Sequence, residues 1–339
     1  MSLRQLLDQV YQHAGIAHKR DISVLTPYMP VVPAGLHPNG DDTAALPHPY
    51  GHTLFAIEGF IEEFVEHDPW FAGWCGVMVN VSDIAAMGGR PNAIVNAIWD
   101  KGGSKAELLM QGMRDAANAF GVSIVGGHTN LRANQTQLAV AILGHANSLL
   151  SSFAARPGQA LVAAIDLRGK YRPPFLNWDA ATSAPPERLR GDISLLSEIA
   201  DKQLASAAKD ISQAGLLGTT VMLLECSGVG AELNLNAIPR PDGVAWSDWL
   251  CSFPSFGYLL ATDHANLPEL LGTFSDRGIC AAEIGRIVRE PMLNLRDGDE
   301  YETFWNLNSS LLMGLGRGAD RVDEIKKSAT KQEVYSCPL

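Results

Sequence analysis

The feature that most constrains the fold of this chain is a long apolar segment that carries a single charged side chain. Asp68 and Pro69 are typical of the start of an α-helix, and the Gly-Gly-Arg-Pro sequence after Met87 predicts its end. Tryptophan, phenylalanine, valine, methionine, isoleucine and alanine side chains cover most of the circumference of this helix. Because a helix that is apolar on nearly every side is buried, we expect a core of the protein to form around it.

The charged residue of this helix is Asp83. Gly76, Asn80, Asp83 and Met87 follow one another at helical spacing and form one stripe along the helix. An unpaired buried carboxylate is costly, so Asp83 needs a partner. Two interpretations are open from these residues alone: Asp83 pairs with Arg90 or caps a neighbouring helix, or it binds a metal ion.

Length and charge narrow the class of protein. A chain of 339 residues favours two domains over one small core. A net charge of −11 and the lack of any basic run argue against a nucleic-acid or membrane-surface partner. The five cysteines are scattered without a C-x-x-C motif, and no apolar run is long enough to span a bilayer. We therefore expect a soluble protein of the reducing cytoplasm.

Helix and strand patterns alternate along the chain in a mixed order. We predict an amphipathic helix over 104–120 with Ser104 and Glu107 as its capping box, and a strand over 121–127 that ends in a tight glycine turn. A boundary is expected near 155–158, which divides an α+β fold into domains of residues 1–155 and 156–339. Further predicted elements are the strands 43–47, 52–58, 92–99, 137–146, 159–167, 230–236 and 257–262 and the helices 192–207, 215–227 and 266–277.

Other carboxylates stand where strands begin or end. Asp41 and Asp42 are either ordinary turn residues or, because adjacent carboxylates repel each other, ligands of a hard cation such as Mg²⁺. Glu58 ends a predicted strand and either is solvated there or faces a site. Asp210 precedes a helix and is either a cap or a site residue.

The residues 125–129, Val-Gly-Gly-His-Thr, are a possible phosphate contact. Free backbone N–H groups in a glycine turn bind phosphate oxygens, although a hairpin turn with a structural histidine explains the same residues.

Taken in order, these motifs resemble one enzyme superfamily. The motifs are GDDTAAL, N-x-S-D-x-x-A-M-G-x-R-P, GVSIVGGHT and DISQAGLLG, and the resemblance covers about residues 35–290. The superfamily contains aminoimidazole ribonucleotide synthetase, selenophosphate synthetase, thiamine-monophosphate kinase and the hydrogenase-maturation dehydratase. The resemblance implies a two-domain α+β chain that homodimerises through the sheets of its N-terminal domains and binds ATP and Mg²⁺.

The resemblance also implies roles for individual residues. By position, the metal-site residues are Asp41, Asp42, Glu58 (where members usually carry Asp), Asp83 and Asp210. The ATP-binding positions are Asn80, Gly126, Gly127, His128 and Thr129.

The branch of the superfamily is not specified. The segment 21–40 has no Cys and no Lys follows Lys19 there, which argues against selenide chemistry, and Cys337 is followed by Pro-Leu where the hydrogenase-maturation branch ends in a Cys. The stretch 168–190 concentrates positive charge and either is a solvated loop or receives an anionic substrate. Its candidate substrate residues are Arg168, Lys170, Arg172, Trp178, Arg188 and Arg190.

These observations lead to a main hypothesis and two alternatives. We expect an Mg²⁺/ATP-dependent enzyme that activates an acyl, amide or hydroxyl oxygen of an unidentified small metabolite as a phosphate. The first alternative is a non-catalytic homodimer that binds a nucleotide or metabolite and keeps the fold. The second is a dimeric scaffold whose acidic residues form salt bridges.

Overall fold

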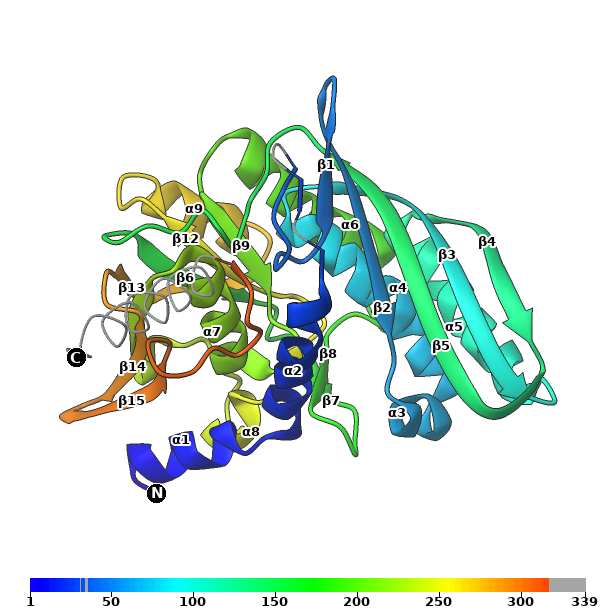
Figure 1. Ribbon diagram of the computed structural model, residues 1–339, viewed down its shortest axis with the longest axis horizontal. Helices are drawn as coiled ribbons and strands as arrows, with labels where there is room; N and C mark the ends of the chain where they lie inside the picture. Colours follow the sequence, from blue (N-terminus) through cyan, green and yellow to red (C-terminus); the bar gives the residue numbers. More distant parts are fainter. Residues whose placement is uncertain (31, 34–35, 317–339) are drawn as a thin grey trace, which may run out of the picture.

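A computed structural model describes residues 1–30, 32–33 and 36–316 of the chain. Two α+β units lie side by side, each built on its own sheet, as Figure 1 shows. The predicted α+β class is thereby confirmed. Cys337 and the rest of 317–339 lie outside the described residues.

The first unit is a five-stranded sheet covered on one face by two helices. The strand order is β1-β2-β5-β3-β4. The strands are β1 (Ala44–His48), β2 (Gly51–Gly59), β3 (Arg90–Lys101), β4 (Ser123–Asn130) and β5 (Arg132–Ala146). The covering helices are α4 (Pro69–Ala86) and α5 (Ser104–Phe120), preceded by the short α3 (Glu62–His67).

The second unit is a seven-stranded sheet with helices on both faces. The strand order is β15-β14-β10-β13-β6-β12-β9. The strands are β6 (Ala160–Ile165), β9 (Ala207–Asp210), β10 (Gly230–Asn234), β12 (Gly257–Thr262), β13 (Cys280–Val288), β14 (Met292–Asp297) and β15 (Glu300–Asn306). Helix α7 (Gly215–Ser227) packs on one face, and α6 (Pro186–Asp201) and α9 (Leu267–Ser275) pack on the other.

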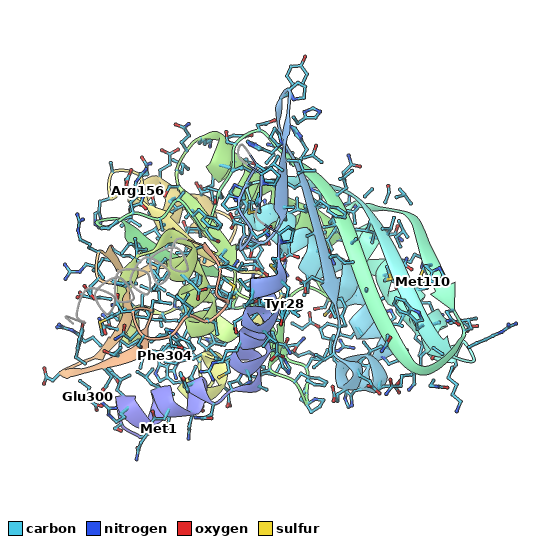
Figure 2. The ribbon with its side chains drawn as sticks, in the orientation of Figure 1. Met1, Tyr28, Met110, Arg156, Glu300 and Phe304 are labelled. Carbon is cyan, nitrogen blue, oxygen red and sulfur yellow. The ribbon has the colours of Figure 1, made fainter. Side chains whose placement is uncertain are left out.

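Two short helices precede the first sheet, and smaller elements join the units. Helix α1 (Leu3–Tyr11) buries Leu3, Leu6, Leu7 and Val10, and α2 (Ala14–Leu25) follows it. After α2 the chain passes through the turn Thr26–Tyr28, and Figure 2 labels the exposed Tyr28 there. The remaining elements are the three-stranded sheet β11-β8-β7, with β7 (Lys170–Tyr171), β8 (Asn177–Asp179) and β11 (Phe253–Pro254), and α8 (Trp246–Trp249).

The apolar helix of the sequence is α4, and the prediction of its bounds and burial is confirmed. Asp68 caps it by accepting a hydrogen bond from the Phe71 N–H, and every residue from Phe71 to Ala86 is buried. Glycines let α5 approach closely, because a Cβ on Gly112 would come 1.8 Å from the Trp70 carbonyl oxygen. Helix α4 therefore lies between its own sheet and the rest of the molecule, which fixes the position of Asp83.

Three predicted details are wrong. Ser104 is not the cap of α5: Gly103 holds that place with φ 104°, and the Asp100 carboxylate accepts hydrogen bonds from the Gly103 and Ala106 N–H groups. There is no glycine turn at 126–127, since β4 continues to Asn130 through a parallel pairing with β3. The helix predicted over 192–207 is α6, which spans Pro186–Asp201, so it both begins and ends earlier than predicted, and the buried residues 207–210 form β9.

Candidate functional site

The two units enclose a cavity of about 820 Å³. Helix α2, the loop 39–42, the end of β2 and one face of α4 form much of its wall. The loop 174–177, the end of β9 with the loop after it, and residues 29, 64, 222, 251, 253, 313 and 315 complete the wall. The cavity thus brings together segments from the whole length of the described chain.

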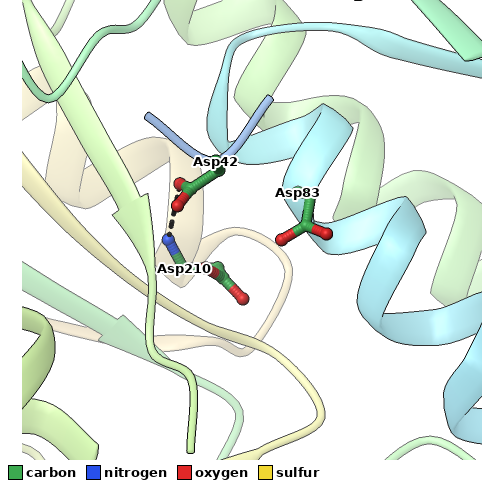
Figure 3. Close-up of side chains that lie close together, drawn as sticks. All are labelled: Asp42, Asp83 and Asp210. Carbon is green, nitrogen blue, oxygen red and sulfur yellow. Dashed lines mark hydrogen bonds between the residues drawn. The ribbon is translucent and has the colours of Figure 1, made fainter. Parts of the chain in front are cut away.

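Three carboxylates converge at this cavity, as Figure 3 shows. Asp42 precedes β1, Asp83 lies in the last turn of α4, and Asp210 is the final residue of β9. One carboxylate oxygen from each lies within 4.8 Å of the others. We refer to these three residues as the acidic cluster.

The acidic cluster is strained electrostatically without a cation. Burial and the neighbouring charges of Asp210, Glu58 and Asp42 raise the pKa of Asp83 well above its ordinary value. Burial and the charge of Asp42 raise the pKa of Asp210 to about 8. The Asp83 Oδ2 atom is buried and has no hydrogen-bond partner among the described residues. Hard carboxylate donors with an unmet oxygen suit Mg²⁺, so the residues present fit this ion.

Lys209 adjoins the acidic cluster and was missed in the sequence. Its Nζ forms a buried ion pair with Asp42 Oδ1, while the Asp210 N–H lies 3.4 Å from Asp42 Oδ2. Burial opposes the charge of Lys209, but the carboxylate of Asp42 raises its pKa above the ordinary value. The signal in the sequence was a lysine inside the apolar run Ala-Ala-Lys-Asp, next to Asp210.

Asp41 has different partners from Asp42 and lies outside the acidic cluster. Its carboxylate accepts hydrogen bonds from Ser151 Oγ at 2.6 Å and the Ser152 N–H at 2.9 Å, and His37 Nε2 lies 2.8 Å away. Burial raises the pKa of Asp41, but the His37 hydrogen bond and the charge of Lys209 outweigh it and lower that pKa. With its oxygens already bonded, Asp41 ties the loop to residues 151–152.

Glu58 and Lys19 face the cavity close to the acidic cluster. Burial raises the pKa of Glu58, whereas the positive charge of Lys19 lowers it. The same charge lowers the pKa values of Asp83 and Asp210, against the larger raising effect of their burial. Among the residues that the structure describes, no carboxylate lies within 4.0 Å of the Lys19 ammonium. Lys19 was not among the predicted site residues, and it lines the cavity because α2 packs there.

The predicted basic substrate group is not at the cavity. Arg168 and Arg188 pair with Asp166 at 2.8 and 3.5 Å, and Arg172 pairs with Asp68 at 2.8 Å. Arg190 donates to the Ala119 carbonyl oxygen at 3.0 Å.

Two other members of the predicted group also lie away from the cavity wall. Lys170 is exposed, and the buried Trp178 donates to the Asp166 carbonyl oxygen. Of the stretch 168–190, the cavity is lined by Pro174, Phe175, Leu176 and Asn177. The arginines of this stretch therefore hold the loop in place through their ion pairs and hydrogen bonds.

The predicted ATP-binding residues lie in two separate places. Asn80 is buried inside α4, where its Nδ2 donates to the Gly76 carbonyl oxygen at 2.8 Å. Gly126, Gly127, His128 and Thr129 are exposed on the edge strand β4, away from the cavity of the same chain. The proposed pairing of Asp83 with Arg90 is wrong, since Arg90 binds Asp201 at 2.9 Å.

Both halves of the chain match one family of known proteins. Residues 40–146 match the N-terminal domain of AIR synthase related protein, and residues 176–298 match its C-terminal domain. The uncharacterized protein sll0787 of Synechocystis is 42% identical over 317 residues, which span 92% of this chain and 98% of that protein.

Two solved structures share the fold. PurL of T. maritima complexed with ATP has a TM-score of 0.70 at 20% identity, over 88% of this chain and 50% of PurL, so this chain spans about half the length of PurL. AaThiL complexed with AMPPCP and TMP has a TM-score of 0.62 at 18% identity, over 84% of this chain and 94% of AaThiL. Within the described residues, no helix has the length and apolarity needed to cross a membrane.

By the match of both domains and of a relative over nearly its whole length, the chain belongs to the AIR synthase related protein family.

Proposed function

We propose that this protein is an Mg²⁺/ATP-dependent enzyme that transfers the γ-phosphoryl group to an oxygen atom of a small metabolite. The observation that carries the proposal is the acidic cluster at the wall of a cavity large enough for a nucleotide and an acceptor. The solved structures of PurL and AaThiL, which share the fold, are complexes with ATP and with AMPPCP. These nucleotide complexes support the proposal by analogy of fold.

The residues divide the work of such a reaction. Asp42, Asp83 and Asp210 would hold Mg²⁺, which supplies neutralisation of the phosphate charges. Lys19 faces the cavity without a close carboxylate and would contact a phosphate oxygen. Lys209 keeps Asp42 oriented through their ion pair. The acceptor oxygen forms a bond to Pγ, the bond from Pγ to the β,γ-bridging oxygen breaks, and ADP leaves with that electron pair, while a hydroxyl acceptor gives its proton to solvent.

We also propose a homodimer formed through the open face of the first sheet. Phe55, Ile57, Val95 and Leu143 lie exposed on neighbouring strands of that face, with exposed fractions of 49%, 65%, 42% and 44%. A contiguous apolar face of this kind is typical of a protein–protein interface. The segment 126–129 on the adjacent edge strand would then lie at the interface, where it remains a proposed nucleotide contact.

Calorimetric titration with AMP-PNP, in the presence and absence of Mg²⁺, tests the proposed function. We expect Mg²⁺-dependent binding to the wild-type protein and its loss in Asp83→Asn. The matched control is Asp100→Asn, because Asp100 is an equally buried aspartate that caps α5 outside the cavity. The control is expected to lose stability and keep nucleotide binding. No nucleotide binding in either condition would refute the proposal.

Turnover separates an enzyme from a non-catalytic binding protein. Release of ADP from Mg²⁺·ATP, stimulated by a fraction of small metabolites, is the result expected for an enzyme. Tight Mg²⁺·ATP binding with no ADP release under any metabolite fraction would instead support the non-catalytic homodimer.

A further inference from the structure

The wall of the cavity changes from acidic to apolar along helix α4. Cys75, Val79 and Asp83 all line the cavity and follow one another every four residues, so they lie on one face of the helix. At 1.5 Å per residue, Cys75 lies roughly 12 Å from Asp83 along the helix axis. The cavity therefore runs from the acidic cluster at one end of this face to an apolar end two turns away.

Apolar side chains from three other segments close this second end. We call these residues the apolar arm: Phe60, Ile61, Phe64, Phe175, Leu176 and Phe253. The rings of Phe64 and Phe175 meet edge to face with centroids 5.3 Å apart, and Phe60 lies 6.5 Å from Phe64. The Phe253 N–H donates to the Leu176 carbonyl oxygen at 2.9 Å, which fixes the two C-terminal segments together. The arm is thus built by both units.

The apolar arm offers no charge to a ligand. The cavity-lining residues among 60–64, 75–79, 174–177, 251 and 253 are aliphatic, aromatic or prolyl, apart from two cysteines and Asn177. Burial raises the pKa of Cys75 well above its ordinary value and that of Cys251 to about 12, so both thiols are neutral at physiological pH. The nearby guanidinium of Arg172 is held by Asp68 and stacks 4.2 Å above the Phe71 ring.

A charged ligand group in this arm would lose its hydration without gaining a partner, which is costly. We propose that the apolar arm binds the acceptor of the ATP-dependent reaction, and that the body of this acceptor is uncharged and aromatic or aliphatic. Its reacting oxygen points toward the acidic cluster. The proposal excludes acceptors whose body carries a phosphate ester or a carboxylate. That the ligand is the acceptor of a reaction rests on the proposed function. The chemical class of ligand that the arm binds is testable without nucleotide.

The first test uses the neutral, apolar dye Nile red as a probe of the arm. We expect saturable binding with a blue-shifted emission, and retention of the dye when Mg²⁺·AMP-PNP is added, because the nucleotide phosphates occupy the acidic end. Failure to bind the dye would overturn the proposal. Displacement of the dye by Mg²⁺·AMP-PNP would also overturn it, since the arm would then hold the adenine. A protein that binds the dye but no nucleotide would overturn the proposed function and leave the arm's ligand class standing.

Variants locate the dye. Phe175→Glu and Ile61→Glu place a carboxylate in the arm at half-buried positions, and each should weaken Nile red binding at least about tenfold. The matched control is Phe55→Glu, because Phe55 is exposed on the sheet face outside the cavity. Loss of binding in the control with no loss in the arm variants would place the dye on the sheet and contradict the proposal.

Selectivity is measured by competition between two ligands of equal shape. 4-Acetylphenylacetamide, whose neutral acetyl group has the size and planarity of a carboxylate, should displace Nile red at a concentration about tenfold lower than 4-carboxyphenylacetamide, which carries a charge on its body. Equal or stronger displacement by the carboxylate compound would show that the arm accepts a charged body and would refute the inference.

Discussion

Asp210 makes the stability of the metal-free protein depend on pH. Its folded pKa is raised to about 8, whereas an aspartate in the unfolded chain titrates near about 4. Between these values the folded protein binds the extra proton, so its contribution to stability is complete at low pH and is lost as pH rises toward 8. The slope is at most about 1.4 kcal/mol per pH unit for one proton.

Thermal unfolding checks this expectation. The melting temperature of the metal-free protein should fall between about pH 6 and pH 8, and Mg²⁺ should reduce the fall by replacing the proton. Asp210→Asn should flatten the profile without metal. A metal-free profile that rises over this range would contradict the described electrostatics of the acidic cluster.

Lys209 gives a second prediction at this scale. Lys209→Met leaves Asp42 buried without its cation, and breaking a buried pair in this way costs about 3–5 kcal/mol. Urea unfolding without metal should show the loss, and Mg²⁺ should recover more stability in the variant than in the wild type. Lys170→Met is the control, because Lys170 is exposed and lies outside the cavity. Equal losses in the two variants would argue against a buried ion pair.

At the scale of elements, the approach of α5 to α4 depends on glycine. A Cβ on Gly112 would overlap the Trp70 carbonyl oxygen, so Gly112→Ala should lower the free energy of unfolding by about 1–3 kcal/mol. Gly272→Ala in α9 is the matched control, since nothing lies within 4 Å of its added Cβ. There alanine should stabilise the helix by about 0.5–1 kcal/mol. Urea denaturation of both variants measures the difference, and equal effects would contradict the close packing.

The elements that could be predicted are those with local signals. Asp68, Pro69 and the closing glycines fixed α4 because capping and helix termination are properties of neighbouring residues. The glycines of β4 were misjudged as a turn, because pairing with β3 is a long-range contact that the local sequence does not contain. The capping of α5 by Asp100 was missed although it is local, because Asp100 lies at the end of β3, three residues before Gly103, and not at the expected capping position Ser104.

At the scale of the whole molecule, the open sheet face predicts a dimer. Ile57→Lys places a charge in the middle of that face and should convert a dimer to a monomer in light scattering. Val24→Lys is the control, because Val24 is equally exposed but belongs to α2. A wild-type protein that is monomeric at micromolar concentration would refute the proposed interface.

Among the residues of the site, those with a local signal in the sequence could be predicted, and those placed by long-range contacts could not. Asp42, Asp83 and Asp210 were recognisable as unusual carboxylates, and the family's motif order gathered them before any geometry was known. Lys19 and Lys209 were missed because their positions depend on how α2 and β9 fold against the cavity. The arginines of 168–190 were misassigned because their partners, Asp166, Asp68 and the Ala119 carbonyl, are distant or lie outside the stretch.

The most direct test of the central claim is a crystal grown with AMP-PNP and Mn²⁺ in place of Mg²⁺, measured for anomalous scattering. The account predicts an anomalous peak roughly 2.1 Å from carboxylate oxygens of the acidic cluster, in contact with the phosphates of the nucleotide. It also predicts that the Lys209 ammonium stays on Asp42. A nucleotide bound elsewhere, or bound here with no metal at Asp42, Asp83 and Asp210, would contradict it.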